Sequence, residues 1–119
     1  MQWLIHGSAD PAIASALIAH EHKTHVVSEL ELPADATPEQ ILVAASKRQW
    51  DVFTTDRALA QAPFGGGPKF TRCIVYFQDG NTDGAAAVDR LFERYSRLSP
   101  GRLYTITASR VKVRQLPSL

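Results

Sequence analysis

Apolar and polar residues follow one another along the chain in two periodicities, which predict strands and helices in alternation. Short apolar runs predict strands, and apolar positions spaced three or four residues apart predict helices. The predicted strands are residues 2–6, 24–27, 52–54, 72–77, 103–106 and 110–114, and the predicted helices are residues 11–20, 39–48, 57–62 and 84–98. This order predicts an α/β fold: a three-layer α/β/α sandwich with a mostly parallel central sheet, right-handed crossovers and a C-terminal hairpin.

Residues that favour helix ends mark where two of these helices begin. Thr37 is a suitable N-cap, Pro38 suits the first helical position, and Gln40 completes a capping box. Asp56 stands directly before the brief helix at 57–62, where a carboxylate satisfies free backbone N–H groups. These signals place both helix starts within a residue or two.

Composition narrows the class of protein. The chain has 119 residues, 21% of them charged and 45% hydrophobic, with a net charge of +1, so no strong overall field attracts nucleic acid or membranes. Its one cysteine excludes an internal disulfide and favours a reducing compartment. No apolar run approaches the roughly 20 residues that span a bilayer. We therefore expect one cytoplasmic domain over residues 1–119, without membrane contact.

Two polar residues are expected to meet where neighbouring strands end. His6 ends the first predicted strand, and Asp56 follows the third. The favoured strand order, 2-1-3-4, puts the first and third strands side by side. In open parallel sheets, binding and chemistry occur just beyond the carboxyl ends of the strands. The sequence therefore predicts that the imidazole of His6 lies close to the Asp56 side chain.

Several different short motifs follow one another along almost the whole length of the chain. They are Pro11 to Leu17, Glu21-His22, Leu30-Glu31-Leu32, Ile41 to Ala45, Thr54-Thr55-Asp56 and Arg110 to Pro117. In this order the chain resembles the small, stand-alone bacterial PIN-like domains of the toxin–antitoxin type. The resemblance rests on the sequence of motifs, because no single one of them is specific.

The resemblance implies an endoribonuclease fold in which three or four carboxylates bind Mg²⁺ or Mn²⁺. This chain departs from the family pattern at three acidic positions, which here hold His6, Pro38 and Ala58. Asp56 is the acid that remains at a matching position. Glu39 lies one residue beyond a lost acid and is a candidate replacement ligand.

These departures leave two hypotheses. The first is a PIN-fold endoribonuclease-like protein with a degenerate acidic metal site, impaired or repurposed, which uses Mg²⁺ or Mn²⁺ if it is active. The second is a non-catalytic module that keeps the fold and binds RNA or a partner protein. RNA, an antitoxin-like protein and a second copy of the chain are the partners that the resemblance implies. Asp10 and Asp79 are further acids that could lean toward the strand ends.

Each candidate residue also has a purely structural interpretation. Asp56 is either a metal ligand and catalytic residue or the N-cap of the next helix. Glu39 is either a metal ligand or a carboxylate favoured by the helix dipole in a first turn. His6 is a general base, a ligand for a softer metal such as Zn²⁺ or Mn²⁺, or a core histidine with its hydrogen bonds satisfied.

Basic residues supply the candidate nucleic-acid contacts. Arg90, Arg94 and Arg97 form a stripe along the helix predicted at 84–98. Such a stripe either contacts RNA phosphates or faces solvent. Three basic residues alternate with valines in the last predicted strand: Arg110, Lys112 and Arg114. Edge strands commonly carry such charges to avoid pairing with other sheets, and contact with RNA is the second interpretation.

Overall fold

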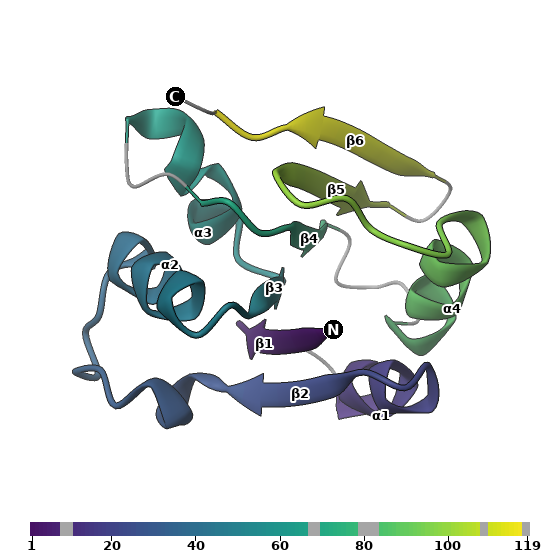
Figure 1. Ribbon diagram of the computed structural model, residues 1–119, viewed down its shortest axis with the longest axis horizontal. Helices are drawn as coiled ribbons and strands as arrows, with labels where there is room; N and C mark the ends of the chain where they lie inside the picture. Colours follow the sequence, from purple (N-terminus) through teal and green to yellow (C-terminus); the bar gives the residue numbers. More distant parts are fainter. Residues whose placement is uncertain (8–10, 67–69, 79–83, 108–109, 118–119) are drawn as a thin grey trace.

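The computed structural model describes residues 1–7, 11–66, 70–78, 84–107 and 110–117, which form one sheet with helices on both of its faces (Figure 1). The strands are β1 (Gln2–His6), β2 (Lys23–Val26), β3 (Asp51–Thr54), β4 (Ile74–Phe77), β5 (Arg102–Ile106) and β6 (Val111–Gln115). The α-helices are α1 (Pro11–Ala19), α2 (Pro38–Lys47), α3 (Arg57–Gln61) and α4 (Gly84–Arg94), and the 3₁₀ helices are η1 (Val27–Leu30) and η2 (Ala62–Gly65).

The strands lie in the order β2-β1-β3-β4-β5-β6. The first five are parallel, and β6 pairs with β5 in the antiparallel direction. This confirms the predicted α/β class, the mostly parallel sheet, the C-terminal hairpin and the order of the first four strands. In the register of β1 and β3, His6 is the partner of Thr54, so the carboxyl ends of these two strands are level.

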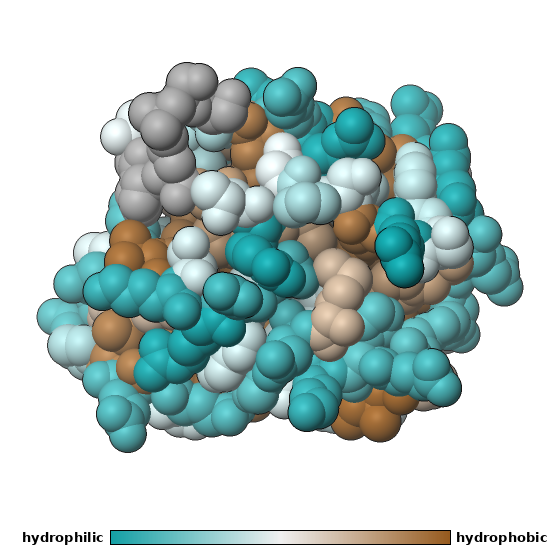
Figure 2. All heavy atoms as spheres, in the orientation of Figure 1, coloured by the Kyte–Doolittle hydropathy of each residue, from teal (hydrophilic) through white to brown (hydrophobic). Residues whose placement is uncertain are grey.

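Alternate residues of the central strands enter two separate cores. On β3, Val52 belongs to the core under α2 and α3, whereas Phe53 belongs to the core under α1 and α4. Every residue of β3 and β4 is buried, as expected for strands covered on both faces. Figure 1 shows the two helix pairs on opposite sides of the sheet. On the face drawn in Figure 2, the remaining apolar residues form separate patches among polar ones.

The connection through α4 has the opposite hand to the other three helical connections. Helix α3 joins β3 to β4 and α4 joins β4 to β5, so both connections step in the same direction across the sheet. The two helices nevertheless lie on opposite faces (Figure 1). Because about 98% of such crossovers are right-handed, all four were expected to be so. That expectation is wrong for at least one connection.

Helices α1 and α4 pack against each other on one face of the sheet. Gly84 opens α4 directly against Ile13, and a Cβ atom at position 84 would lie 2.5 Å from Ile13 Cγ1. The missing side chain therefore lets the two helices approach closely. Val88 and Leu91 of α4 are fully buried in the same core.

Helix α4 is shorter than the sequence predicts. It ends at Arg94 rather than near Leu98. Beyond the helix, Leu98 turns into the core, and the backbone N–H of Ser99 donates to the Tyr104 hydroxyl at 2.9 Å. This contact with β5 supports a turn where the local pattern continues a helix. The prediction that Arg97 shares a helical stripe with the other two arginines is therefore wrong.

Candidate functional site

The carboxyl ends of β1 and β3 bring His6 and Asp56 to neighbouring positions. His6 is the last residue of β1, and Asp56 lies two residues beyond the end of β3. The backbone N–H of Thr55 donates to the His6 carbonyl at 3.3 Å and holds the two strand ends together. The juxtaposition expected from the strand order is therefore present.

The hydroxyl of Thr54, a completely buried residue, links His6 with Asp56. Nδ1 of His6 lies 2.8 Å from Thr54 Oγ1, and the backbone N–H of Asp56 donates to the same oxygen at 2.9 Å. An arrangement in which the hydroxyl donates to Nδ1 satisfies all three groups, because the oxygen already accepts from Asp56. The neutral imidazole then carries its proton on Nε2.

Gly7 allows this close approach. Its φ of +86° is a left-handed conformation that residues with a side chain rarely adopt. A Cβ atom at this position would also collide with the Thr55 hydroxyl. The glycine after β1 is thus required by the geometry of the two strand ends.

Burial determines the charge of the histidine. Partial burial lowers the pKa of His6 below its ordinary value, and the nearby carboxylate of Asp56 opposes this only in part. The imidazole is therefore neutral at pH 7. At this edge of the sheet the protein presents a neutral ring beside one half-buried carboxylate.

Asp56 caps a helix, which is the structural one of the two roles predicted for it. Its Oδ1 accepts the backbone N–H of Ala58 at 2.9 Å, which makes it the N-cap of α3. One carboxylate oxygen is thereby committed to the helix. The role of Asp56 as a metal ligand stays a prediction.

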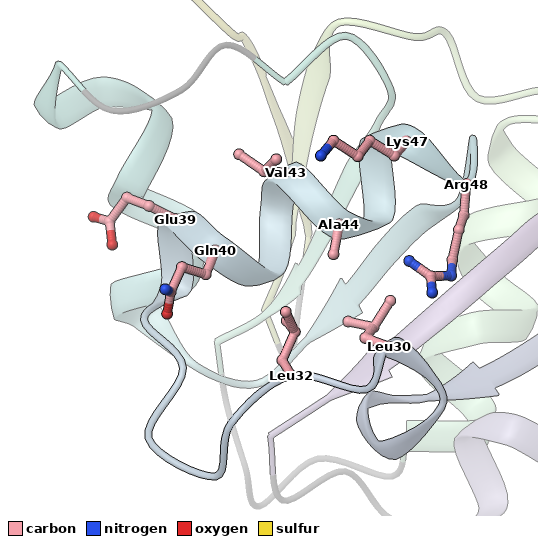
Figure 3. Close-up of a pocket in the computed structure, with 8 residues that line it drawn as sticks. All are labelled: Leu30, Leu32, Glu39, Gln40, Val43, Ala44, Lys47 and Arg48. Atoms are coloured by element: carbon pink, nitrogen blue, oxygen red, sulfur yellow. The ribbon is translucent and has the colours of Figure 1, made fainter.

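Glu39 lies in the first turn of α2, where it lines a groove between α2 and the segment after η1 (Figure 3). The groove has a volume of about 530 Å³, and its wall is largely apolar, with Leu30, Leu32 and Val43 among its lining residues. The side chain of Glu39 is exposed, and no hydrogen bond or ion pair within the described residues joins it to Asp56. The structure therefore does not show the two carboxylates acting as one site.

The residues that the structure describes around His6 and Asp56 include few ligands for a divalent metal of the Mg²⁺ class. Among them, no three His, Cys, Asp or Glu side chains gather as a metal would require. Mg²⁺ prefers several oxygen ligands, whereas the described residues at this edge offer one carboxylate and an imidazole. Asp10 and Asp79, the other acids considered, lie outside the described residues.

The arginines form a different grouping from the one predicted. Arg90 and Arg94 of α4 line a cavity of about 190 Å³ together with Arg110, which precedes β6. The rest of its wall comes from α4 and the β5–β6 hairpin, through Ala87, Ile106, Thr107 and Val111. Arg97 instead lines a separate cavity, formed in part by the segment that follows the carboxyl end of α4. Sequence reasoning missed Arg110 as a partner of the α4 arginines, although its place in a basic strand was visible.

A buried ion pair at the amino ends of the strands was also missed. Asp51, whose side chain is 2% exposed, accepts from Arg72 Nη2 at 3.1 Å and from the Cys73 backbone N–H at 3.0 Å. Burial raises the pKa of the neighbouring Cys73 thiol, which leaves it protonated and unreactive. The available signal was an aspartate inside an otherwise apolar strand.

Within the described part of the chain, no helix has both the length and the apolar character that crossing a membrane requires. Comparison with known proteins adds no relative. No protein-family model matches the chain, no curated protein matches it, and no solved structure matches it.

Proposed function

We propose that this protein is a PIN-like domain, built as an α/β/α three-layer sandwich, that binds RNA and lacks metal-dependent cleavage. The observation that carries the proposal is the cavity lined by Arg90, Arg94 and Arg110. Its described lining residues include three arginines, two from α4 and one from the segment before β6. The PIN-like assignment and the cytoplasmic location come from the order of motifs and the composition of the chain.

Guanidinium groups in such a cluster suit phosphate groups. Arginine offers several N–H donors in a fixed plane and binds phosphate oxygens in pairs of hydrogen bonds. Arg90 and Arg94 are one helical turn apart, and Arg110 approaches from the neighbouring hairpin. Arg94 also lies 5.6 Å from the ring of Tyr95, which supplies an aromatic surface beside the charges.

The carboxyl edge of the sheet supports a role without metal-dependent cleavage. Where the resemblance implies acids, the chain has His6, Pro38 and Ala58, and the remaining Asp56 caps α3. A nucleic-acid-binding role needs the fold and the arginines but no metal. An antitoxin-like protein and a second copy of the chain remain predicted partners.

The test is RNA affinity measured over a series of salt concentrations. The double variant Arg90→Gln/Arg94→Gln is compared with Lys47→Gln/Arg57→Gln, which removes two exposed charges from the opposite face of the sheet. If two phosphate contacts are lost, the slope of log K against log salt falls by about 1.4, since each contact on a single strand contributes about 0.7. Equal affinity and slope in the two double variants would reject the proposal.

A metal-dependent endoribonuclease is the second candidate, favoured by the juxtaposition of His6 and Asp56. Asp56→Asn is the informative variant because an amide oxygen still caps α3, whereas the charge that a metal needs is lost. Cleavage of RNA with Mn²⁺ or Mg²⁺ by the wild type, abolished in Asp56→Asn, would establish this candidate. Equal cleavage by both proteins would exclude it.

A further inference from the structure

A second cavity lies at the amino ends of the parallel strands. Its volume is about 320 Å³, and its polar wall includes His22, Asp51, Arg72 and Arg97. His22 stands directly before β2, and Arg72 lies two residues before β4, while Asp51 is the first residue of β3. Leu98 and Pro100 form an apolar part of the wall. None of these residues lines the cavity that holds Arg90, Arg94 and Arg110.

The charges in this wall do not cancel. Two arginines, Arg72 and Arg97, and the amino group of Met1 stand beside one carboxylate, so positive groups outnumber the negative one. Both oxygens of Asp51 are already engaged, one by Arg72 Nη2 at 3.1 Å and one by the Cys73 backbone N–H at 3.0 Å. Burial is the main cause that lowers the pKa of His22, so its ring adds no charge at pH 7. The cavity therefore matches a negatively charged ligand.

Two buried nitrogen atoms of lining residues make no hydrogen bond to any described residue. They are Nε of Arg72 and Nδ1 of His22. Buried polar atoms without a partner are rare in native proteins, and each one calls for an explanation. The Arg72 atom is a donor. The His22 ring also hydrogen-bonds the backbone of Met1, which leaves Nδ1 as an acceptor in the neutral ring.

The aromatic surroundings hold the His22 ring in place. It stacks on Phe92 with 4.7 Å between ring centroids and meets the edge of Trp3 at 6.2 Å. Trp3 is fully buried, and its Nε1 is a further donor without a partner among the described residues. Because the ring is fixed on two sides, Nδ1 presents its lone pair in a defined direction.

We infer that this cavity binds a small oxyanion that also carries a hydroxyl group, such as a monoprotonated phosphate or a hydroxycarboxylate. Its negatively charged oxygens accept from Arg72 Nε and from the guanidinium of Arg97. Its hydroxyl donates to His22 Nδ1. A carboxylate without a hydroxyl group accepts from the donors but leaves His22 Nδ1 without a partner. The site should therefore bind an oxyanion that carries a hydroxyl group more tightly than one that lacks it.

Titration of the full chain at constant ionic strength, followed by amide and indole N–H resonances, tests the inference. The probes are inorganic phosphate, glycolate and acetate, and glycolate differs from acetate by the hydroxyl alone. Saturable shifts are expected with phosphate, glycolate or both, and the responding probe identifies the kind of oxyanion. Acetate should bind about tenfold more weakly than glycolate, the factor that one hydrogen bond of about 1.4 kcal/mol provides.

Four variants locate the site. Arg72→Lys keeps a positive charge for Asp51 but removes Nε, and it should weaken binding about tenfold; Arg97→Gln should weaken it about threefold. His22→Phe keeps the ring contacts and should abolish the preference for glycolate over acetate. Arg57→Gln, an exposed arginine on α3, is the matched control and should change nothing. The inference is overturned if no probe saturates, or if the control weakens binding as much as Arg72→Lys.

Discussion

The ion pair between Asp51 and Arg72 offers the sharpest test of how this fold is stabilised. In Asp51→Asn the amide oxygen can still accept the Cys73 backbone N–H, which lies 3.0 Å from Oδ1 in the wild type. The amide NH₂ group, however, then faces Arg72 Nη2, and two donors oppose each other. Asp51→Ala removes both interactions and leaves the Cys73 N–H buried without an acceptor.

The magnitude follows from the exposure of the two partners. Breaking a fully buried ion pair costs about 3–5 kcal/mol, but here the Arg72 side chain is 33% exposed, whereas that of Asp51 is 2% exposed. Because Arg72 can regain contact with water, we expect Asp51→Asn to lower the free energy of unfolding by about 1.5–3 kcal/mol. Asp51→Ala should cost about 3–5 kcal/mol, since an unsatisfied backbone N–H is added.

Urea unfolding followed by circular dichroism measures these differences. For a chain of this length, each kcal/mol corresponds to a fall of about 3–5 °C in Tm. Asp35→Asn, at an exposed position, is the control and should stay within about 0.5 kcal/mol of the wild type. The reasoning is refuted if Asp51→Asn is as stable as this control, or if Asp51→Ala costs no more than Asp51→Asn.

Three further predictions follow from buried groups. Thr54→Val removes the hydroxyl between His6 Nδ1 and the Asp56 N–H, so urea unfolding should show a loss of about 1–3 kcal/mol relative to Thr54→Ser; equal stability would contradict the network. Because burial lowers the pKa of His6 in the folded state, the unfolded chain binds more protons, and the free energy of unfolding should decrease as pH falls from about 6.5 through the lower folded pKa. In unfolding curves recorded over this pH range, His6→Gln should show a smaller decrease, and an identical one would count against the assignment. The Cys73 thiol, whose pKa burial raises, should react with maleimide at pH 8 only as fast as the protein unfolds, and fast labelling of the folded protein would disprove its burial.

Local patterns in the sequence account for much of the architecture. The predicted capping box exists, because the Gln40 backbone N–H donates to Thr37 Oγ1 at 3.2 Å and Thr37 N–H donates to Gln40 Oε1 at 2.8 Å. The alternation of apolar runs and helical spacing correctly predicts the α/β class, the mostly parallel sheet and the closing hairpin. His6 and Asp56 meet because parallel neighbours align their carboxyl ends, a consequence that strand order alone provides.

Features that depend on contacts between distant residues could not be predicted in this way. Helix α4 ends early where the Tyr104 hydroxyl accepts the Ser99 N–H, a bond that exists only once β5 is in place. That turn separates Arg97 from the α4 arginines, and the hairpin brings Arg110 to them instead. Periodicity specifies which residues share a face of one element. It does not specify which faces of different elements meet, because that depends on packing and hydrogen bonds across the whole chain.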